Sequence, residues 1–90
     1  MDVKSYIYQS KNGALSIIEN GIVASAIIMT SDSVDFIWLK REDSDREDIR
    51  IYRSGEDYIT IEGDKCTYRN DSSDKSWESS LIGSEGIHNG

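Results

Sequence analysis

The sequence has little of what secreted domains and membrane proteins depend on, since it contains a single cysteine, Cys66, and no long apolar run. A lone cysteine excludes an internal disulfide, and an unpaired thiol favours a reducing compartment. No apolar stretch reaches the roughly 18 residues of a membrane-spanning helix. Residues 1–9 also lack the charged-then-apolar layout of a signal peptide. We therefore expect a cytoplasmic protein without membrane association.

Residues that carry catalytic chemistry are equally scarce. The one histidine, His88, lies in a segment rich in glycine and asparagine, and Cys66 falls on an inward position of a predicted strand, where a thiol is usually inert. The sequence contains no zinc-type Cys/His pair, phosphate-binding glycine loop, nucleophile elbow or dinucleotide fingerprint. We expect a protein that is not an enzyme and that binds no cofactor.

Basic residues are outnumbered, and the net charge is −7 at pH 7. Residues 41–48 contain five acidic side chains and two arginines, while residues 70–90 contain four acidic side chains and one lysine. Direct binding to nucleic acid or to an anionic membrane needs a basic face, so the sequence disfavours both. A basic surface on another protein is compatible with this charge.

The first thirty residues predict a three-stranded meander. The dipeptides at 12–13 and 20–21 are both Asn-Gly, the strongest short signal for a two-residue hairpin turn. Taken literally, these turns place Ile7, Ile18 and Val23 in one row across the strands. The opposite face then carries Tyr8, Ile17 and Ala24. A short helix over residues 13–20 is the alternative, which the isoleucines disfavour.

Residues 34–40 predict a fourth strand that is apolar on both faces. Val34, Phe36 and Trp38 share one face, and Ile37 and Leu39 share the other. Such a pattern is typical of a central strand or of a strand in a closed sheet.

After the acidic segment, residues 49–53 alternate as a strand. The alternation predicts that Ile49 and Ile51 point inward and that Arg50 and Tyr52 point outward.

Two further hairpins follow. For Ile51 to meet Ile59, the loop around Gly55 must have an odd length, with Gly55 in an unusual backbone conformation. Residues 63–64 form a two-residue turn, which predicts four cross-strand pairs: Ile61 with Cys66, Ile59 with Tyr68, Glu62 with Lys65, and Tyr58 with Arg69.

The segment 70–90 is rich in serine and glycine and loses its periodicity. We expect residues 1–69 to form the β domain and this segment to be a tail, partly docked through Trp77. The tail would form either one turn of helix, with Ser73 as N-cap, or a last edge strand. Beyond Gly83 we expect it to fray.

These elements predict an all-β fold, a small antiparallel barrel or compact sandwich of six or seven short strands. The alternative is an α+β fold, in which a short C-terminal helix covers one antiparallel sheet.

The acidic segment 41–48 has three interpretations. A calcium loop is disfavoured because the position that requires glycine is Asp48 and because Arg46 lies within the segment. A solvated loop is the commonest structure for a charged run. The third interpretation is partner recognition, in which extended residues 43–47 would present a row of anions to a cationic groove. We expect no metal site here.

The resulting hypothesis is a small acidic binding protein, an inhibitor or immunity-type protein that covers a basic nucleic-acid-binding or catalytic surface of a partner. The candidate partner-binding residues are Glu42, Asp43, Asp45, Glu47, Asp48, Tyr52 and Arg53. A self-assembling β module with a solubilising acidic loop is the alternative, which allows a homo-oligomer. A cation-binding module is the third.

Overall fold

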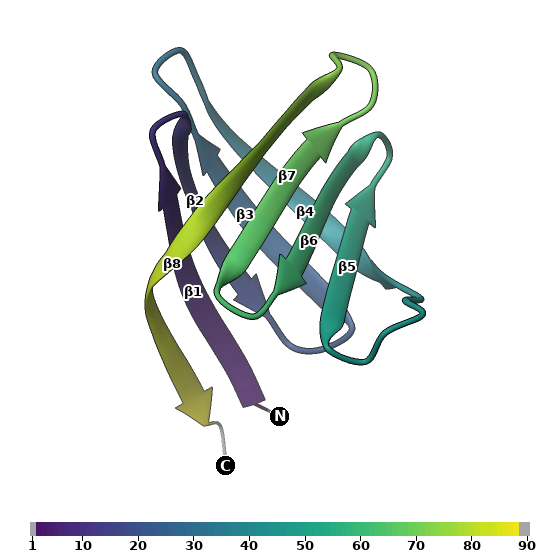
Figure 1. Ribbon diagram of the computed structural model, residues 1–90. Helices are drawn as coiled ribbons and strands as arrows, with labels where there is room; N and C mark the ends of the chain where they lie inside the picture. The colour runs from purple at the N-terminus through teal and green to yellow at the C-terminus, as the bar shows by residue number, and fades with distance from the viewer. Residues whose placement is uncertain (1, 89–90) are drawn as a thin grey trace.

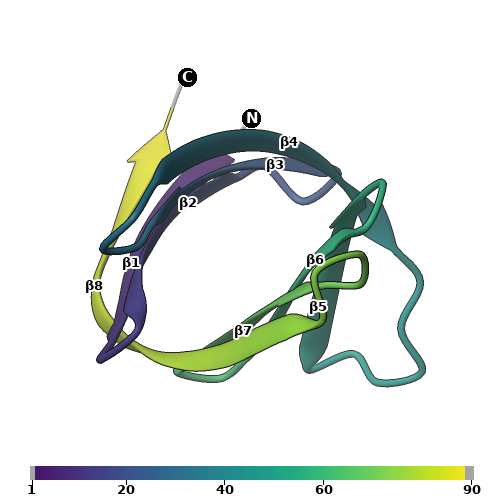
Figure 2. The same cartoon turned by 90° about the horizontal axis from the view of Figure 1, so that it is seen from above.

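The computed structural model describes residues 2–88, with side-chain environments described for residues 3–85, and the chain is all-β. Each strand pairs antiparallel with the next, and the last pairs with the first, which closes the sheet into a barrel (Figures 1 and 2). The strands are β1 Asp2–Ser10, β2 Gly13–Glu19, β3 Val23–Met29, β4 Val34–Glu42, β5 Ile49–Ser54, β6 Asp57–Glu62, β7 Lys65–Asn70 and β8 Lys75–His88. The predicted small antiparallel barrel is confirmed, with eight strands instead of six or seven.

Side chains fill the interior of the barrel. A barrel of about eight strands is just wide enough for this. The buried apolar core consists of Tyr8, Leu15, Ile17, Ala24, Ala26, Ile28, Leu39, Tyr52, Ile59, Ile61 and Cys66. Because this core is packed, surfaces for binding must lie at the two ends of the barrel or on its outer face.

The predicted faces of β1–β3 are confirmed, but the predicted register is wrong by two residues. Tyr8 pairs with Leu15 rather than with Ile17, and Ile17 pairs with Ala26 rather than with Ala24. The faces survive because side chains alternate with a period of two, so an even shift leaves each residue on its side. The alternative helix over residues 13–20 is wrong, since these residues form β2.

Gly13 has a steric role that differs from the predicted one. This residue is not in the turn but begins β2, where its backbone approaches β3 so closely that a Cβ atom would collide with the carbonyl oxygen of Met29. Glycine is therefore required here for close approach rather than for a turn.

We expect Gly13→Ala to lower the free energy of unfolding by about 1–3 kcal/mol, because the added methyl group overpacks the β2–β3 contact. Gly83→Ala is the matched control, since a Cβ atom at Gly83 has no neighbour within 4 Å. Urea denaturation of both variants measures the difference. Equal stability of the two variants would contradict the close approach at Gly13.

The predicted orientation of β5 is wrong. Arg50 and Tyr52 point into the barrel, and Tyr52 is fully buried, whereas Ile51 lies on the outer face. Ser54 pairs directly with Asp57, so the connection to β6 is a two-residue turn and not an odd-length loop. Gly55 has a φ of +59°, and its unusual conformation is as predicted.

The β6–β7 hairpin has the predicted register. Glu62 pairs with Lys65 across the turn at 63–64, and the three other predicted pairs are also present. Gly63 has a φ of +57°, which glycine adopts without steric cost.

The segment expected to be a tail is largely the eighth strand. β8 pairs with β7 on one side and with β1 on the other, so it is neither a helix nor an edge strand. Its pairing continues past Gly83 to His88, and residues 89–90 lie outside the described residues. Trp77 is partly buried and packs against the core. The centroid of its ring lies 6.0 Å from that of Tyr68.

Candidate functional site

The acidic segment divides between the end of β4 and the loop that follows it. Arg41 and Glu42 belong to β4, and residues 43–48 form a loop that stands out from the barrel (Figure 2). All five acidic side chains are exposed. The loop bends and turns over residues 45–48, so the anions do not form the extended row that an alternating strand would give.

Arginines neutralise part of this acidic segment. Arg46 forms ion pairs with Asp48 and, at 3.6 Å, with Glu62, while Arg53 lies 3.7 Å from Glu42. Within the described residues, the ion pairs do not include the other three acids of the segment, Asp43, Asp45 and Glu47. These three carboxylates carry the charge that the loop presents to solvent.

The two candidate residues of β5 are separated by the barrel wall. Tyr52 is buried and cannot serve as the surface anchor that its predicted orientation implied. Arg53 remains on the surface, where it donates a 2.8 Å hydrogen bond to the carbonyl of Gly55 and stacks 5.1 Å from the ring centre of Tyr58.

Tyr52 instead belongs to a charged cluster inside one end of the barrel. Glu19 is only 6% exposed, and its carboxylate accepts hydrogen bonds from the Tyr52 hydroxyl and from Arg50 Nε at 3.1 Å. A second contact joins Arg50 Nη2 to the other carboxylate oxygen at 2.9 Å. Burial, together with the hydrogen bond to Glu19, raises the pKa of Tyr52 to about 12. The cluster satisfies its own charges and supports the fold.

Of the two residues considered for catalysis, Cys66 lies in the barrel interior, and the side chain of His88 lies outside the described side chains. Cys66 is fully buried, and this burial raises the pKa of its thiol to about 12, which keeps the thiol protonated. Among the described side chains, no group of three or more His, Cys, Asp and Glu residues could hold a metal ion. None of the described residues belongs to a helix long and apolar enough to cross a membrane.

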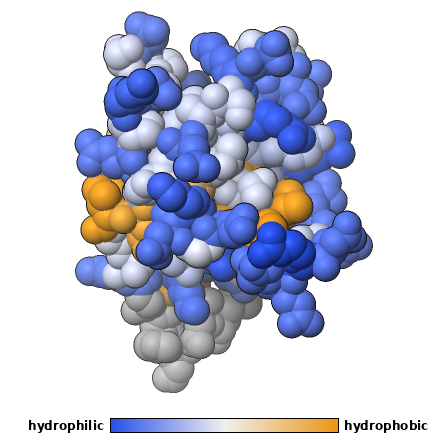
Figure 3. Space-filling view, in the orientation of Figure 1, coloured by the Kyte–Doolittle hydropathy of each residue, from blue (hydrophilic) through white to orange (hydrophobic). Residues whose placement is uncertain are grey.

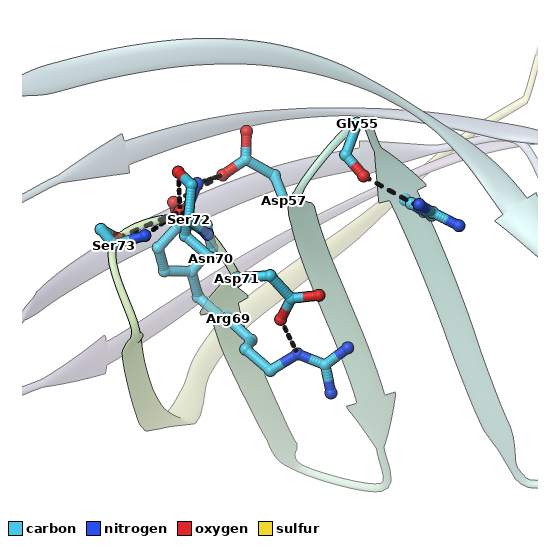
Figure 4. Close-up of polar contacts among 9 residues, drawn as sticks. Gly55, Asp57, Arg69, Asn70, Asp71, Ser72 and Ser73 are labelled. Carbon is cyan, nitrogen blue, oxygen red and sulfur yellow. Dashed lines mark hydrogen bonds and ion pairs between the residues drawn. The ribbon is translucent and has the colours of Figure 1, made fainter.

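The other end of the barrel carries a pair of carboxylates, Asp35 and Asp57. Asp57 accepts hydrogen bonds from the Tyr68 hydroxyl at 2.7 Å and from Asn70 Nδ2 at 2.6 Å, and Figure 4 shows its carboxylate beside Asn70. Burial and the bond to Asp57 raise the pKa of Tyr68 to about 12. Asp35 accepts a bond from the Ser33 hydroxyl. Both carboxylates line a pocket of about 290 Å³.

The outer face of β1–β4 differs in character from the rest of the surface. The outward positions of β1–β3, and of β4 as far as Trp38, carry no charged side chain. Exposed apolar residues on this outer face are Ile7, Ile18, Ile27, Val34, Phe36 and Trp38. The outer surface of β5–β8 carries many charges and is mostly hydrophilic in Figure 3. Exposed apolar residues gathered on one side of a monomer often mark a functional surface.

Phe36 and Trp38 are the most prominent members of the uncharged outer face. They are 56% and 66% exposed, and their rings meet edge to face with centroids 5.4 Å apart. The next outward residue of the same strand after Trp38 is Lys40, and the one after that, Glu42, is the first carboxylate of the acidic segment. β4 therefore joins an exposed aromatic pair to the loop that carries the free acidic charge.

Sequence reasoning identified the acidic segment but missed the charged cluster and the uncharged outer face. The cluster depends on the closure of the barrel, because closure places β2 and β5 opposite each other, so that their inward side chains meet in the interior. The outer face had a visible signal, namely apolar side chains on both faces of the fourth predicted strand. That pattern predicts a central strand or a strand in a closed sheet rather than one with an open edge. β4 does belong to a closed sheet, but one of its faces is exposed to solvent and it pairs with β5 over only three residues.

Comparisons with protein-family models, with curated proteins and with solved structures found no match for this chain.

Proposed function

We propose that this protein is a non-enzymatic binding protein that covers a basic surface of a partner protein, as an inhibitor or immunity-type protein does. The observation that carries the proposal is the uncharged outer face of β1–β4, which leads through Phe36 and Trp38 into the acidic loop. Protein interfaces commonly have an apolar, aromatic centre and a charged rim, and tryptophan is enriched among the residues that dominate affinity.

The dimensions of the outer face support a composite binding surface. Four strands of about seven residues cover roughly 19 by 23 Å, or about 400 Å². A stable interface buries about 800 Å² on each partner, so the uncharged outer face, apolar and polar positions together, supplies at most about half of what is needed. The adjacent acidic loop would supply the rest, with Asp43, Asp45 and Glu47 steering a basic partner by long-range attraction. The unpaired Cys66 thiol agrees with a reducing, cytoplasmic setting for this binding.

Self-association through the same outer face is the alternative function. Two convex barrels touch over less area than either face offers, and each copy carries a net charge of −7. Both features favour a different, basic protein over a second copy. Light scattering across a concentration series separates the two, since a stable closed oligomer that Trp38→Ser dissociates would replace the proposal by self-assembly.

Trp38→Ser is expected to weaken partner binding by about 2 kcal/mol or more, roughly thirtyfold, because an aromatic anchor near the interface centre is lost. The partner is first captured from cells that express the protein, then purified and titrated by calorimetry.

Asp43→Ala combined with Glu47→Ala is expected to weaken binding mainly at low salt, since exposed charges are screened as ionic strength rises.

The matched control for this test is Ile82→Ser on β8. Ile82 is 63% exposed, almost as much as Trp38, but it lies beside Ile7 at the far border of the uncharged outer face, four strands away from β4 around the barrel. It should leave the affinity nearly unchanged. Equal losses for Ile82→Ser and Trp38→Ser, or binding that is indifferent to both Trp38→Ser and salt, would contradict the proposed function.

A further inference from the structure

The strand β4 is paired along only part of one edge. On one side it pairs with β3 from Val34 to Lys40, and Arg41 continues this pairing by donating to the carbonyl of Ile22 at 2.8 Å. On the other side it pairs with β5 only over Lys40–Glu42. Within the described residues, the stretch from Val34 to Leu39 therefore has one edge without a neighbouring strand.

The backbone groups at this open edge have a definite direction. In an antiparallel strand the N–H and C=O of one residue point to the same side, and the next residue points to the other side. The backbone N–H of Arg41 points to the β3 side. The residues that alternate with it, Phe36 and Trp38, therefore direct their N–H and C=O groups to the open edge. An edge of six residues is roughly 20 Å long, enough to pair with a short strand.

An acidic pocket lies on one side of this edge, and exposed aromatic side chains lie on the other. Toward the barrel interior is the pocket lined by Asp35 and Asp57, and Ile37 and Tyr68 also line it. The ion pairs of the described residues include neither carboxylate. Toward the outside are the exposed rings of Phe36 and Trp38. A strand laid along β4 would therefore have an acidic pocket under one of its faces and aromatic rings beside the other.

We propose that the open edge of β4 between Val34 and Leu39 binds an extended segment of a partner by strand addition, and that this segment alternates basic and apolar side chains. Its backbone would exchange hydrogen bonds with Phe36 and Trp38, as in other cases of β-augmentation. Its basic side chains would enter the pocket at Asp35 and Asp57, and its apolar side chains would lie beside the aromatic rings. This inference rests on the proposed function and specifies how the partner is recognised.

The inward charge at Asp35 also disfavours a second copy of the chain as occupant. Natural proteins protect open edges with inward-pointing charges, because such charges prevent edge-to-edge pairing. A second β4 laid along this edge would bring its own Asp35 into the same acidic pocket. Asp35 is exposed at the mouth of this pocket, where two like charges still repel each other, whereas a lysine or arginine removes the repulsion.

The probe is an acetylated and amidated peptide of three valine–lysine repeats, titrated into the ¹⁵N-labelled protein. We expect saturable binding with a dissociation constant below about 1 mM, with the largest amide shifts at Phe36, Ile37 and Trp38. Asp35→Asn combined with Asp57→Asn should weaken binding by about tenfold at low salt. Asparagine keeps the hydrogen-bonding capacity of Asp57 toward Tyr68 and Asn70.

The controls separate strand addition from simple charge attraction. Asp64→Asn combined with Glu78→Gln removes the same number of charges at exposed positions of the β6–β7 turn and of β8, and it should leave the affinity nearly unchanged. A fully N-methylated peptide keeps its charge but cannot donate backbone hydrogen bonds, and it should not bind. Equal binding of the two peptides, equal losses in the two double variants, or absence of binding would overturn the inference. The proposed function would still stand if partner binding depends on Trp38.

Discussion

Arg50→Met is expected to lower the free energy of unfolding by about 3–5 kcal/mol, because it leaves a buried carboxylate without its cation. Glu19 is 6% exposed, and Arg50 holds both of its oxygens while Tyr52 donates to one of them. A methionine replaces the aliphatic part of the arginine side chain but offers no charge and no hydrogen-bond donor. Urea denaturation at pH 7 measures the loss, which is a large fraction of the stability of a small domain.

Two variants show whether burial of the charge is the cause. Arg46→Met breaks an ion pair between exposed side chains, those of Arg46 and Asp48, and should change stability far less. Glu19→Gln combined with Arg50→Met removes both charges and should recover part of the loss, since the uncompensated anion is gone. A loss for Arg50→Met that is no greater than the loss for Arg46→Met would contradict this account of the cluster.

The second large effect is a fall in stability at alkaline pH. The pKa values of Cys66, Tyr52 and Tyr68 are each raised to about 12, with burial as the largest cause. Above the pKa values of the unfolded chain, about 9 for the thiol and about 10 for the phenols, the unfolded state releases protons that the folded state retains. Stability is therefore complete below pH 9 and is lost as pH rises toward 12.

For Cys66 the size of this loss of stability follows from the pKa shift. A shift of one pKa unit corresponds to about 1.4 kcal/mol, so a shift from 9 to about 12 amounts to about 4 kcal/mol at high pH. Urea denaturation at pH 8, 10 and 11 measures the decline. Cys66→Ala removes the titrating thiol and should lose less stability between pH 8 and 11 than the unaltered protein. The same decline in both proteins would show that the thiol is not buried as described.

Local patterns were sufficient for the parts of the fold that depend on near neighbours. The β6–β7 hairpin follows from one glycine-containing turn and from alternation on its two sides, and its whole register was predictable. The first two hairpins kept their predicted faces but not their registers. Gly13 lies in β2 rather than in the turn, and its close approach to Met29 on β3 is a contact that no pattern along the chain predicts.

The errors arose where closure of the barrel decides the outcome. In β5 the isoleucines were expected inside, yet Arg50 and Tyr52 are inside because Glu19 on β2 meets them across the barrel interior. The segment after Asn70 has no clear periodicity, yet it forms β8 because β1 and β7 each offer it an edge to pair with.

The candidate site also combines a feature that the sequence predicts with features that depend on the closed fold. The acidic segment was visible in the composition of residues 41–48, because charge does not depend on the fold. The open edge of β4 was not visible, since it exists only because β5 pairs with three residues of β4 and then turns away. Phe36 and Trp38 were recognised as sharing a face, but which face meets solvent is decided by the curvature of the closed sheet.

Hydrogen exchange of the β4 amides, measured with and without the purified partner, tests the central claim most directly, namely that β4, with its exposed aromatic pair and its open edge, is the binding surface. In the free protein, the amides of Phe36 and Trp38 should exchange faster than those of Ile37 and Leu39, which face β3. With the partner bound, Phe36 and Trp38 should become protected. Protection confined to β5–β8, or to the end of the barrel around Glu19, would contradict the account.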